Sequence, residues 1–275
     1  MNQSKRIFLV LSILSLVLLL IGQKLGGRQG LLFAFLISIA ANTLIYYYAD
    51  IRILNMFKNK PIEGNDPWDI NLMLRELSHT AKLPVPKIYS TKLESPTAIT
   101  IGKSWTQSSI LVSEKLLEKL SKDELKAVLA LELAKIKRHD TLAMGMLSIF
   151  TSFWLQISQT LDSIIFMHWI FKKRIYAFTY VSLPILKVIL YITIHPSTYY
   201  ASDKFAVELL PNPKLLAEVI WKLESYASTI PLKVPLDTAH LFIVNPLPKD
   251  GVYKWLRIQP EYSLRIQRLV GHFPI

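Results

Sequence analysis

AVLALELAKIKRHD, residues 127–140, decides the fold, because it combines a helical pattern of apolar residues with a carboxylate on the apolar side. Apolar residues recur here at spacings of three and four, which is typical of one face of an α-helix. Glu132 falls on that face, where the pattern asks for a core residue. A buried carboxylate is costly unless a partner compensates its charge. The apolar stripe runs through Leu125, Val128, Leu129, Glu132 and Ile136.

The start of this helix and a partner for its carboxylate are both visible in the sequence. Ser121 and Glu124 form the S-x-x-E pattern of a capping box, which predicts that the helix opens there. Lys135 lies about one helical turn after Glu132, so its ammonium group can reach the carboxylate. We therefore predict that Glu132 and Lys135 form a buried ion pair.

Two long apolar runs open the chain. The first, residues 7–22, follows two basic residues, and the second, residues 31–49, carries no charge. The hydrocarbon core of a bilayer requires about 20 apolar residues in a helix. No small-residue cleavage site follows the first run, and another apolar run comes at once. We therefore predict an uncleaved transmembrane helical hairpin over residues 1–49, with the lipid bilayer as a partner.

A second pair of apolar runs covers residues 141–171 and 175–194. The first of these carries Gln156, Gln159 and Asp162 on one helical face, which indicates a polar seam turned towards protein or water. We predict that residues 141–195 form a second pair of membrane-spanning helices. Partial docking of these helices into the membrane is the alternative.

The polar remainder, residues 50–140 and 196–275, mixes helix and strand patterns and predicts a peptidase-like domain in two parts, of the α+β class. Short strands are expected at residues 87–90, 97–101 and 109–112, the last two joined by a hairpin connection. Helix starts are expected at Asn65-Asp66-Pro67 and Asn212-Pro213, because a capping side chain precedes a proline in the first turn.

Composition excludes several classes of function. The 275 residues contain no cysteine, which removes disulfides, thiolate catalysis and cysteine-ligated metals. The net charge of +12 arises from basic residues that flank apolar runs or alternate with acids, so we expect no nucleic-acid partner. The larger set of basic flanks favours a cytoplasmic position for both termini and the polar domain.

The helix at residues 121–140 and several later blocks resemble the HtpX-type membrane-bound zinc metallopeptidases, in which A-V-x-A-H-E-x-x-H-I-x-x-x-D stands at this place. TAITIG (97–102) is similar to the edge strand of that family, and AHLFIVNPL (239–247) to a stretch before its C-terminal helix. QPEYSLRIQRL (259–269) resembles the family's H-P-x-x-x-x-R-I-x-x-L. The resemblance implies a zincin-like fold and a place in the bacterial cytoplasmic (inner) membrane.

The departures from the family pattern fall on the metal ligands. The two histidines of H-E-x-x-H correspond here to Leu131 and Lys135, and the glutamate of the later E-x-x-A-D motif corresponds to Thr198. Leucine offers no lone pair, and lysine must first lose its proton. The resemblance therefore implies that all three former metal-ligand positions are lost, and we expect neither zinc nor another cofactor.

Two acids of the motif remain, Glu132 at the general-base position and Asp140 at its end. Without a metal-bound water Glu132 is a weak catalyst, so it is expected to be vestigial. An alternative metal site would use Glu132, His139 and His195, and zinc is expected only in that case.

These points lead to the expectation of a proteolytically inactive HtpX-like protein that binds or regulates in membrane-protein quality control. Its expected partners are misfolded or membrane-protein segments, or an active protease relative. The expected peptide-binding strand consists of Thr97, Ala98, Ile99, Thr100 and Ile101, because edge strands of such folds align extended substrates. Two alternatives remain: an active metalloendopeptidase or other hydrolase with an unrecognised ligand set, and a purely structural membrane subunit.

Overall fold

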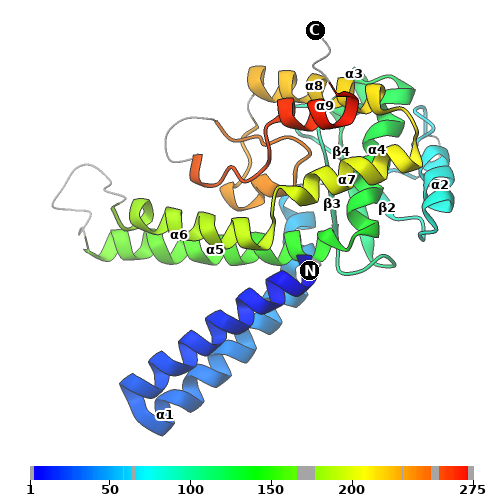
Figure 1. The fold of residues 1–275 in the computed structure, drawn as a ribbon. Helices are drawn as coiled ribbons and strands as arrows, with labels where there is room; N and C mark the ends of the chain where they lie inside the picture. The colour runs from blue at the N-terminus through cyan, green and yellow to red at the C-terminus, as the bar shows by residue number, and fades with distance from the viewer. Residues whose placement is uncertain are drawn as a thin grey trace.

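The computed structural model describes residues 3–57, 59–63, 66–165, 177–230, 232–248 and 254–271 (Figure 1). Its fold is α+β, mostly helical with one small mixed sheet. The helices are α1 Gln3–Met56, α2 Ile70–Ala81, α3 Glu114–Lys119, α4 Lys122–Lys137, α5 Asp140–Ile165, α6 Ala177–Thr193, α7 Ser197–Leu209, α8 Pro213–Thr229, the 3-10 helix η1 Leu236–Leu241 and α9 Tyr262–Val270. The strands are β1 Asn59–Pro61, β2 Lys87–Thr91, β3 Ala98–Gly102 and β4 Ser108–Ser113.

Helix α1 is folded into the hairpin that the two apolar runs predict. The helix breaks at Gly26 and Gly27, and Gly27 has a φ of 53° with a ψ of −136°, a conformation that only glycine adopts easily. The two arms pack closely, since a Cβ atom on Gly30 would overlap the carbonyl oxygen of Gly22. The hairpin projects away from the rest of the molecule (Figure 1). Most of its apolar side chains are left uncovered.

Three helical stretches of the described residues are long and apolar enough to cross a membrane, namely Gln3–Met56, Asp140–Ile164 and Ala177–Leu209. This is therefore a membrane protein. In the second pair, the Asp162 carboxylate accepts hydrogen bonds from the backbone N–H groups of Phe178 at 2.6 Å and Thr179 at 3.0 Å, which caps α6. The expected end of the third apolar run, residues 166–171, lies outside the described residues.

The sheet places β3 at one edge, in the order β1-β2-β4-β3. β3 and β4 are antiparallel, as the predicted hairpin connection requires, while β2 and β4 are parallel. β1 was not predicted, because its sequence NKP has no apolar alternation. The three predicted strands agree with β2, β3 and β4 to within one residue at each end.

Helix α4 lies at the centre of the polar domain, against α2, α7, α8 and β3. Its capping box is present as predicted, with Ser121 and Glu124 hydrogen-bonded reciprocally. The predicted apolar stripe is too narrow, however, because Ala127, Ala130 and Leu133 on the other faces are buried as well. Small and apolar residues all round a helix indicate complete burial, so α4 is a core helix rather than a surface helix.

One of the two other predicted helix starts is correct. Asn212 caps α8 by accepting the N–H of Leu215 at 3.0 Å, and Pro213 lies in the first turn. The other helix, α2, begins at Ile70, later than predicted. The Asp66 carboxylate accepts the backbone N–H of Asn71, the second residue of α2, at 2.8 Å, and that of Trp68, in the turn before the helix, at 3.2 Å.

Candidate active site

Glu132 and Lys135 form the buried ion pair that the sequence predicts. The Lys135 ammonium donates to Glu132 Oε1 at 2.8 Å and to the backbone carbonyl of Leu241 at 3.2 Å. The hydroxyl of Thr100, on β3, donates to Glu132 Oε2. Side-chain exposure is 0% for Glu132 and 4% for Lys135, so protein groups alone solvate both charges. Each carboxylate oxygen therefore has a donor, which is the condition under which a buried charge is tolerated.

The three former ligand positions, one of which is Lys135 itself, do not offer a set of metal ligands. Leu131 and Thr198 are buried, and Lys135 directs its ammonium towards Glu132. A catalytic zinc requires three protein ligands with free lone pairs. Among the described ranges, no group of three or more His, Cys, Asp or Glu residues is placed to hold a metal ion. The residues present therefore do not fit a zinc ion in the arrangement of the H-E-x-x-H motif.

The alternative metal set is not brought together either. His139 packs edge-on against Trp105, with ring centroids 4.9 Å apart. His195 makes a 2.9 Å hydrogen bond to Ser197 through Nδ1 and packs against Tyr191. Neither ring forms a ligand cluster with Glu132 in the part of the chain that the structure describes.

Asp140, the retained acid at the end of the motif, forms an ion pair with a neighbour. Its Oδ2 accepts from Arg138 Nε at 3.0 Å, and its side chain is fully buried. Asp140 is also the first residue of α5, where a negative charge is favourable to the helix dipole. These contacts give the residue a structural role at the junction of α4 and α5.

A second buried ion pair was missed by the sequence reasoning. Arg265 on α9 donates to both carboxylate oxygens of Asp203 on α7, at 2.9 Å and 2.6 Å, and to the carbonyl of Ile243 at 2.7 Å. Burial works against the charge of Arg265, but the Asp203 carboxylate raises the pKa of the guanidinium above its ordinary value. The R-I-x-x-L block contains this arginine, but nothing in it indicates that Asp203, 62 residues away, is its partner.

The predicted peptide-binding strand is covered in this structure. Residues Ala98 to Ile101 are each about 1% exposed, and Thr97, which precedes the strand, is 6% exposed. The outer edge of β3 is met by an isolated antiparallel bridge between Ile99 and Phe242. A peptide can therefore pair along the full length of this edge only if the segment around Phe242 moves.

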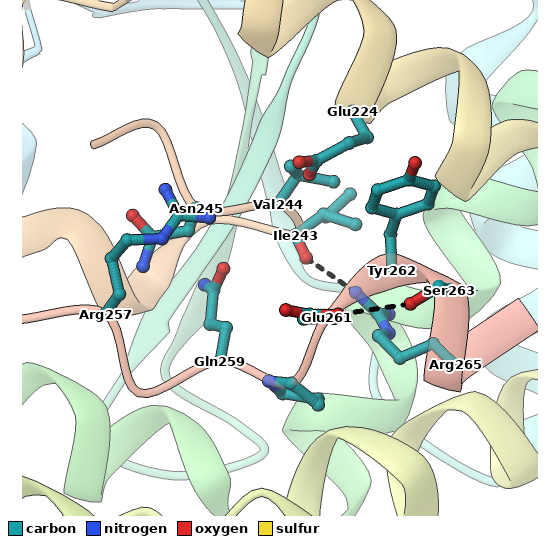
Figure 2. A pocket seen from close by; sticks show the side chains of 11 residues that line it. Glu224, Ile243, Val244, Asn245, Arg257, Gln259, Glu261, Tyr262, Ser263 and Arg265 are labelled. Carbon is teal, nitrogen blue, oxygen red and sulfur yellow. Dashed lines mark hydrogen bonds between the residues drawn. The ribbon is translucent and has the colours of Figure 1, made fainter. Parts of the chain in front are cut away.

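A polar cleft of about 440 Å³ lies beside that segment, lined by residues of 243–245 and 257–265 together with Glu224. Figure 2 shows Gln259 pointing from its loop towards the segment that carries Ile243 and Asn245, and Arg265 bonded to the Ile243 carbonyl. Arg257, on the rim, donates to the Leu247 carbonyl. Burial lowers the pKa of Arg257 from its ordinary value.

Comparison with known proteins identifies relatives along nearly the whole chain. The protein is 32% identical over 277 residues to "Protease HtpX homolog" of Pelotomaculum thermopropionicum, covering 98% of each chain. It is 31% identical to the proteins of that name from Desulfatibacillum aliphaticivorans and Aquifex aeolicus, covering 99% and 92% of this chain. These relatives support the resemblance to HtpX-type enzymes.

Two expectations from the sequence are contradicted by these relatives. The loss of the ligand residues led us to expect a chain without enzymatic activity and without a cofactor, whereas the family and its HtpX members point to a protease with zinc. The finding that overturns both expectations is this kinship, at about 30% identity over the whole chain. The side chains present at Leu131, Lys135 and Thr198 do not fit a zinc ion, although the relatives are named as proteases.

The fold and the family agree. Over 98% of its length the chain superposes on 65% of the crystal structure of S. mikatae Ste24p, with a TM-score of 0.52 and 15% identity, a likeness that concerns the fold alone. The profile of "Peptidase family M48" matches residues 67–272, which include every element from α2 to α9. The chain belongs to peptidase family M48, as an HtpX-like membrane protein.

Proposed function

We propose that this protein binds extended polypeptide segments at the edge of β3, beside the membrane, as a component of membrane-protein quality control. The clients would be unfolded chains or segments of membrane proteins, and an active protease relative would be a partner. The division of labour follows the sequence: residues 1–49 and 141–195 anchor the protein, and residues 50–140 and 196–275 form the domain that receives the client. We place that domain on the cytoplasmic side of the bacterial inner membrane.

One observation carries this proposal: β3 packs against α1 and α5, helices that are long and apolar enough to cross a membrane. The turn after β3 holds Lys103, whose ammonium is 5.1 Å from the ring centroid of Tyr47 on the second arm of α1. Tyrosines at the end of an apolar helix are typical of the interface between lipid and water. A segment that leaves the bilayer along these helices would arrive beside β3 and the segment that covers its outer edge.

Strand addition to this edge would suit clients of many sequences. Main-chain hydrogen bonds supply the affinity in this binding mode, and side-chain pockets add specificity. The edge of β3 opposite β4 has no partner strand within the sheet, and it carries only the single bridge to Phe242.

Photo-crosslinking tests the proposal. A small diazirine amino acid at Ile101, on β3, is expected to crosslink unfolded β-casein added to the protein in detergent. The same amino acid at Lys60, on the opposite edge of the sheet, is the matched control and is expected to give no product. Crosslinks at Lys60 alone, or at neither position, would contradict binding at β3.

The kinship with HtpX proteases favours a second candidate, an active metalloendopeptidase that uses ligands other than the motif positions. About one zinc per chain after purification without chelator, the stoichiometry of a catalytic site, would support it. Cleavage of β-casein that is lost in Glu132→Gln would support it further. Near-zero zinc that stays near zero after zinc is added, with no cleavage, would argue against it.

A further inference from the structure

The segment that covers β3 is held almost entirely by side chains. All five backbone carbonyls of residues 239–243 accept a hydrogen bond from a side chain of α4, α7, α9 or the loop before α9. Gln259 Nε2 donates to Ala239 at 3.4 Å and Phe242 at 2.7 Å, the Tyr199 hydroxyl to His240 at 3.1 Å, Lys135 Nζ to Leu241 at 3.2 Å and Arg265 Nη1 to Ile243 at 2.7 Å.

These donors contact the main chain of the segment. Lys135 is the partner of Glu132, and Arg265 is the partner of Asp203, so the two buried ion pairs hold two of the donors in place. Tyr199 is 3% exposed and lies on α7. Every residue carries a backbone carbonyl, so a row of donors that binds carbonyl groups can bind a backbone of any sequence.

We propose that Lys135, Tyr199, Gln259 and Arg265 form a binding site for the backbone of one polypeptide segment, in the conformation of residues 239–244, a 3-10 turn followed by extended chain, and that these residues fill the site until a client displaces them. This inference rests on the proposed function, because the segment that enters would lie between these donors and the edge of β3. Lys135 then has a binding role: it presents to a client carbonyl the positive charge that it also presents to Glu132.

Two features make the covering segment displaceable. It is joined to β3 by one bridge, Ile99 to Phe242, instead of a continuous ladder. The cleft of about 440 Å³ beside residues 243–245 leaves space next to the segment. The hydrogen bonding around the segment is also incomplete. Asn245 Nδ2 and Gln259 Oε1 are buried but have no hydrogen-bond partner among the residues that the structure describes.

The absence of cysteine from the chain permits a direct test by locking the segment. Continuing the antiparallel register of the Ile99–Phe242 bridge by two residues puts Thr97 opposite Val244. In the pair Thr97→Cys and Val244→Cys, oxidation would fix the segment on β3 with little change in side-chain volume. The probe is a fluorescein-labelled peptide of the sequence AHLFIVNPL, which copies residues 239–247 and fits the donor row by construction.

Oxidation of this variant is expected to weaken binding of the peptide at least tenfold, and reduction is expected to restore it. The pair Lys60→Cys and Ser90→Cys, which are opposite one another in β1 and β2, is the matched control. Its oxidation is expected to leave peptide binding unchanged. Equal binding by the oxidised and reduced forms of the Thr97/Val244 variant would overturn the inference.

Hydrogen exchange of the unmodified protein gives an independent reading that needs no folded variant. Saturating peptide is expected to speed amide exchange in residues 239–245 while β3 remains protected. Unchanged exchange in that segment, in a protein that binds the peptide and gives crosslinks from Ile101, would overturn displacement but leave the proposed function standing. Crosslinks from neither edge of the sheet would instead contradict the proposed function.

Discussion

The two buried ion pairs of this domain are built differently. Glu132 and Lys135 lie on one helix and share one hydrogen bond, with Thr100 and the Leu241 carbonyl completing the set. Asp203 and Arg265 join α7 to α9 through two parallel hydrogen bonds. The first pair compensates a carboxylate that the helix carries in its core, and the second fastens two helices together. The same type of interaction thus serves local compensation in one case and tertiary assembly in the other.

The comparison of the two ion pairs also concerns the candidate active site around Glu132. The cation of each pair also donates a hydrogen bond to a backbone carbonyl of residues 239–243: Lys135 to Leu241 and Arg265 to Ile243. The surroundings of Glu132 therefore form one hydrogen-bond network with the segment that covers β3. Removing one member of a buried pair costs more than the pair contributes, because the remaining charge is left without a partner. Single substitutions can therefore rank the two pairs.

Arg265→Met is expected to have the largest effect. The change leaves the Asp203 carboxylate and the Ile243 carbonyl without their donor, and it is expected to lower the free energy of unfolding by about 3–5 kcal/mol. Urea unfolding in detergent, followed by tryptophan fluorescence, measures it. Arg268→Met is the matched control on the same helix, because Arg268 lies over the Tyr200 ring and forms no buried pair. Similar losses for both variants would contradict the assignment.

Lys135→Met is expected to destabilise the protein by about 3 kcal/mol, within the range for a broken buried pair. Glu132→Gln is expected to cost less, about 1–2 kcal/mol, because the amide oxygen still accepts from Lys135. The same unfolding experiment ranks the two variants. Equal or reversed losses would show that Lys135 is not needed to compensate the charge of Glu132.

His240, in the segment that both pairs hold, is expected to make stability depend on pH. Burial lowers the pKa of its ring in the folded state, where the ring contacts the Met144 carbonyl at 2.9 Å. The unfolded chain takes up this proton near pH 6.5, so the stabilisation is complete above about that pH and is lost as the pH falls, by at most about 1.4 kcal/mol per unit. In His240→Gln this loss is absent. The unfolding free energies of the unmodified protein and of His240→Gln should therefore converge as the pH is lowered from 7.5 to 5.5. A constant difference between the two proteins over this range would contradict the prediction.

Lys115→Ala is expected to have the smallest effect. Lys115 and Glu118 form an ion pair 2.7 Å long on α3, but their side chains are 46% and 50% exposed. Solvent screens such pairs, and their contribution is about 0–1 kcal/mol. The loss in unfolding free energy should lie below that of every buried variant. A loss equal to that of Lys135→Met would mean that burial does not explain the difference in stabilisation between the exposed Lys115–Glu118 pair and the buried pairs.

Local patterns were predictable where neighbouring residues decide the outcome. The capping box at Ser121, the cap at Asn212, the three strands and the pairing of Lys135 with Glu132 all depend on groups a few residues apart. The start of α2 was misplaced because Asp66 reaches the N–H of Asn71 across an intervening turn, whereas a capping residue normally stands directly before its helix. The burial of α4 on every face was missed because alanines such as Ala127 and Ala130 fit equally well inside and outside a core.

By itself the sequence determined the membrane hairpin, the α+β class, the core position of Glu132 and the departures from the zinc motif, since each depends on residue type and spacing. Only the tertiary structure decided that Arg265 meets Asp203 and that residues 239–243 cover β3. These contacts join positions such as Ile99 and Phe242 that are far apart along the chain. Their hydrogen bonds are directed to backbone carbonyls, which every residue carries, so no sequence pattern marks them before the chain has folded.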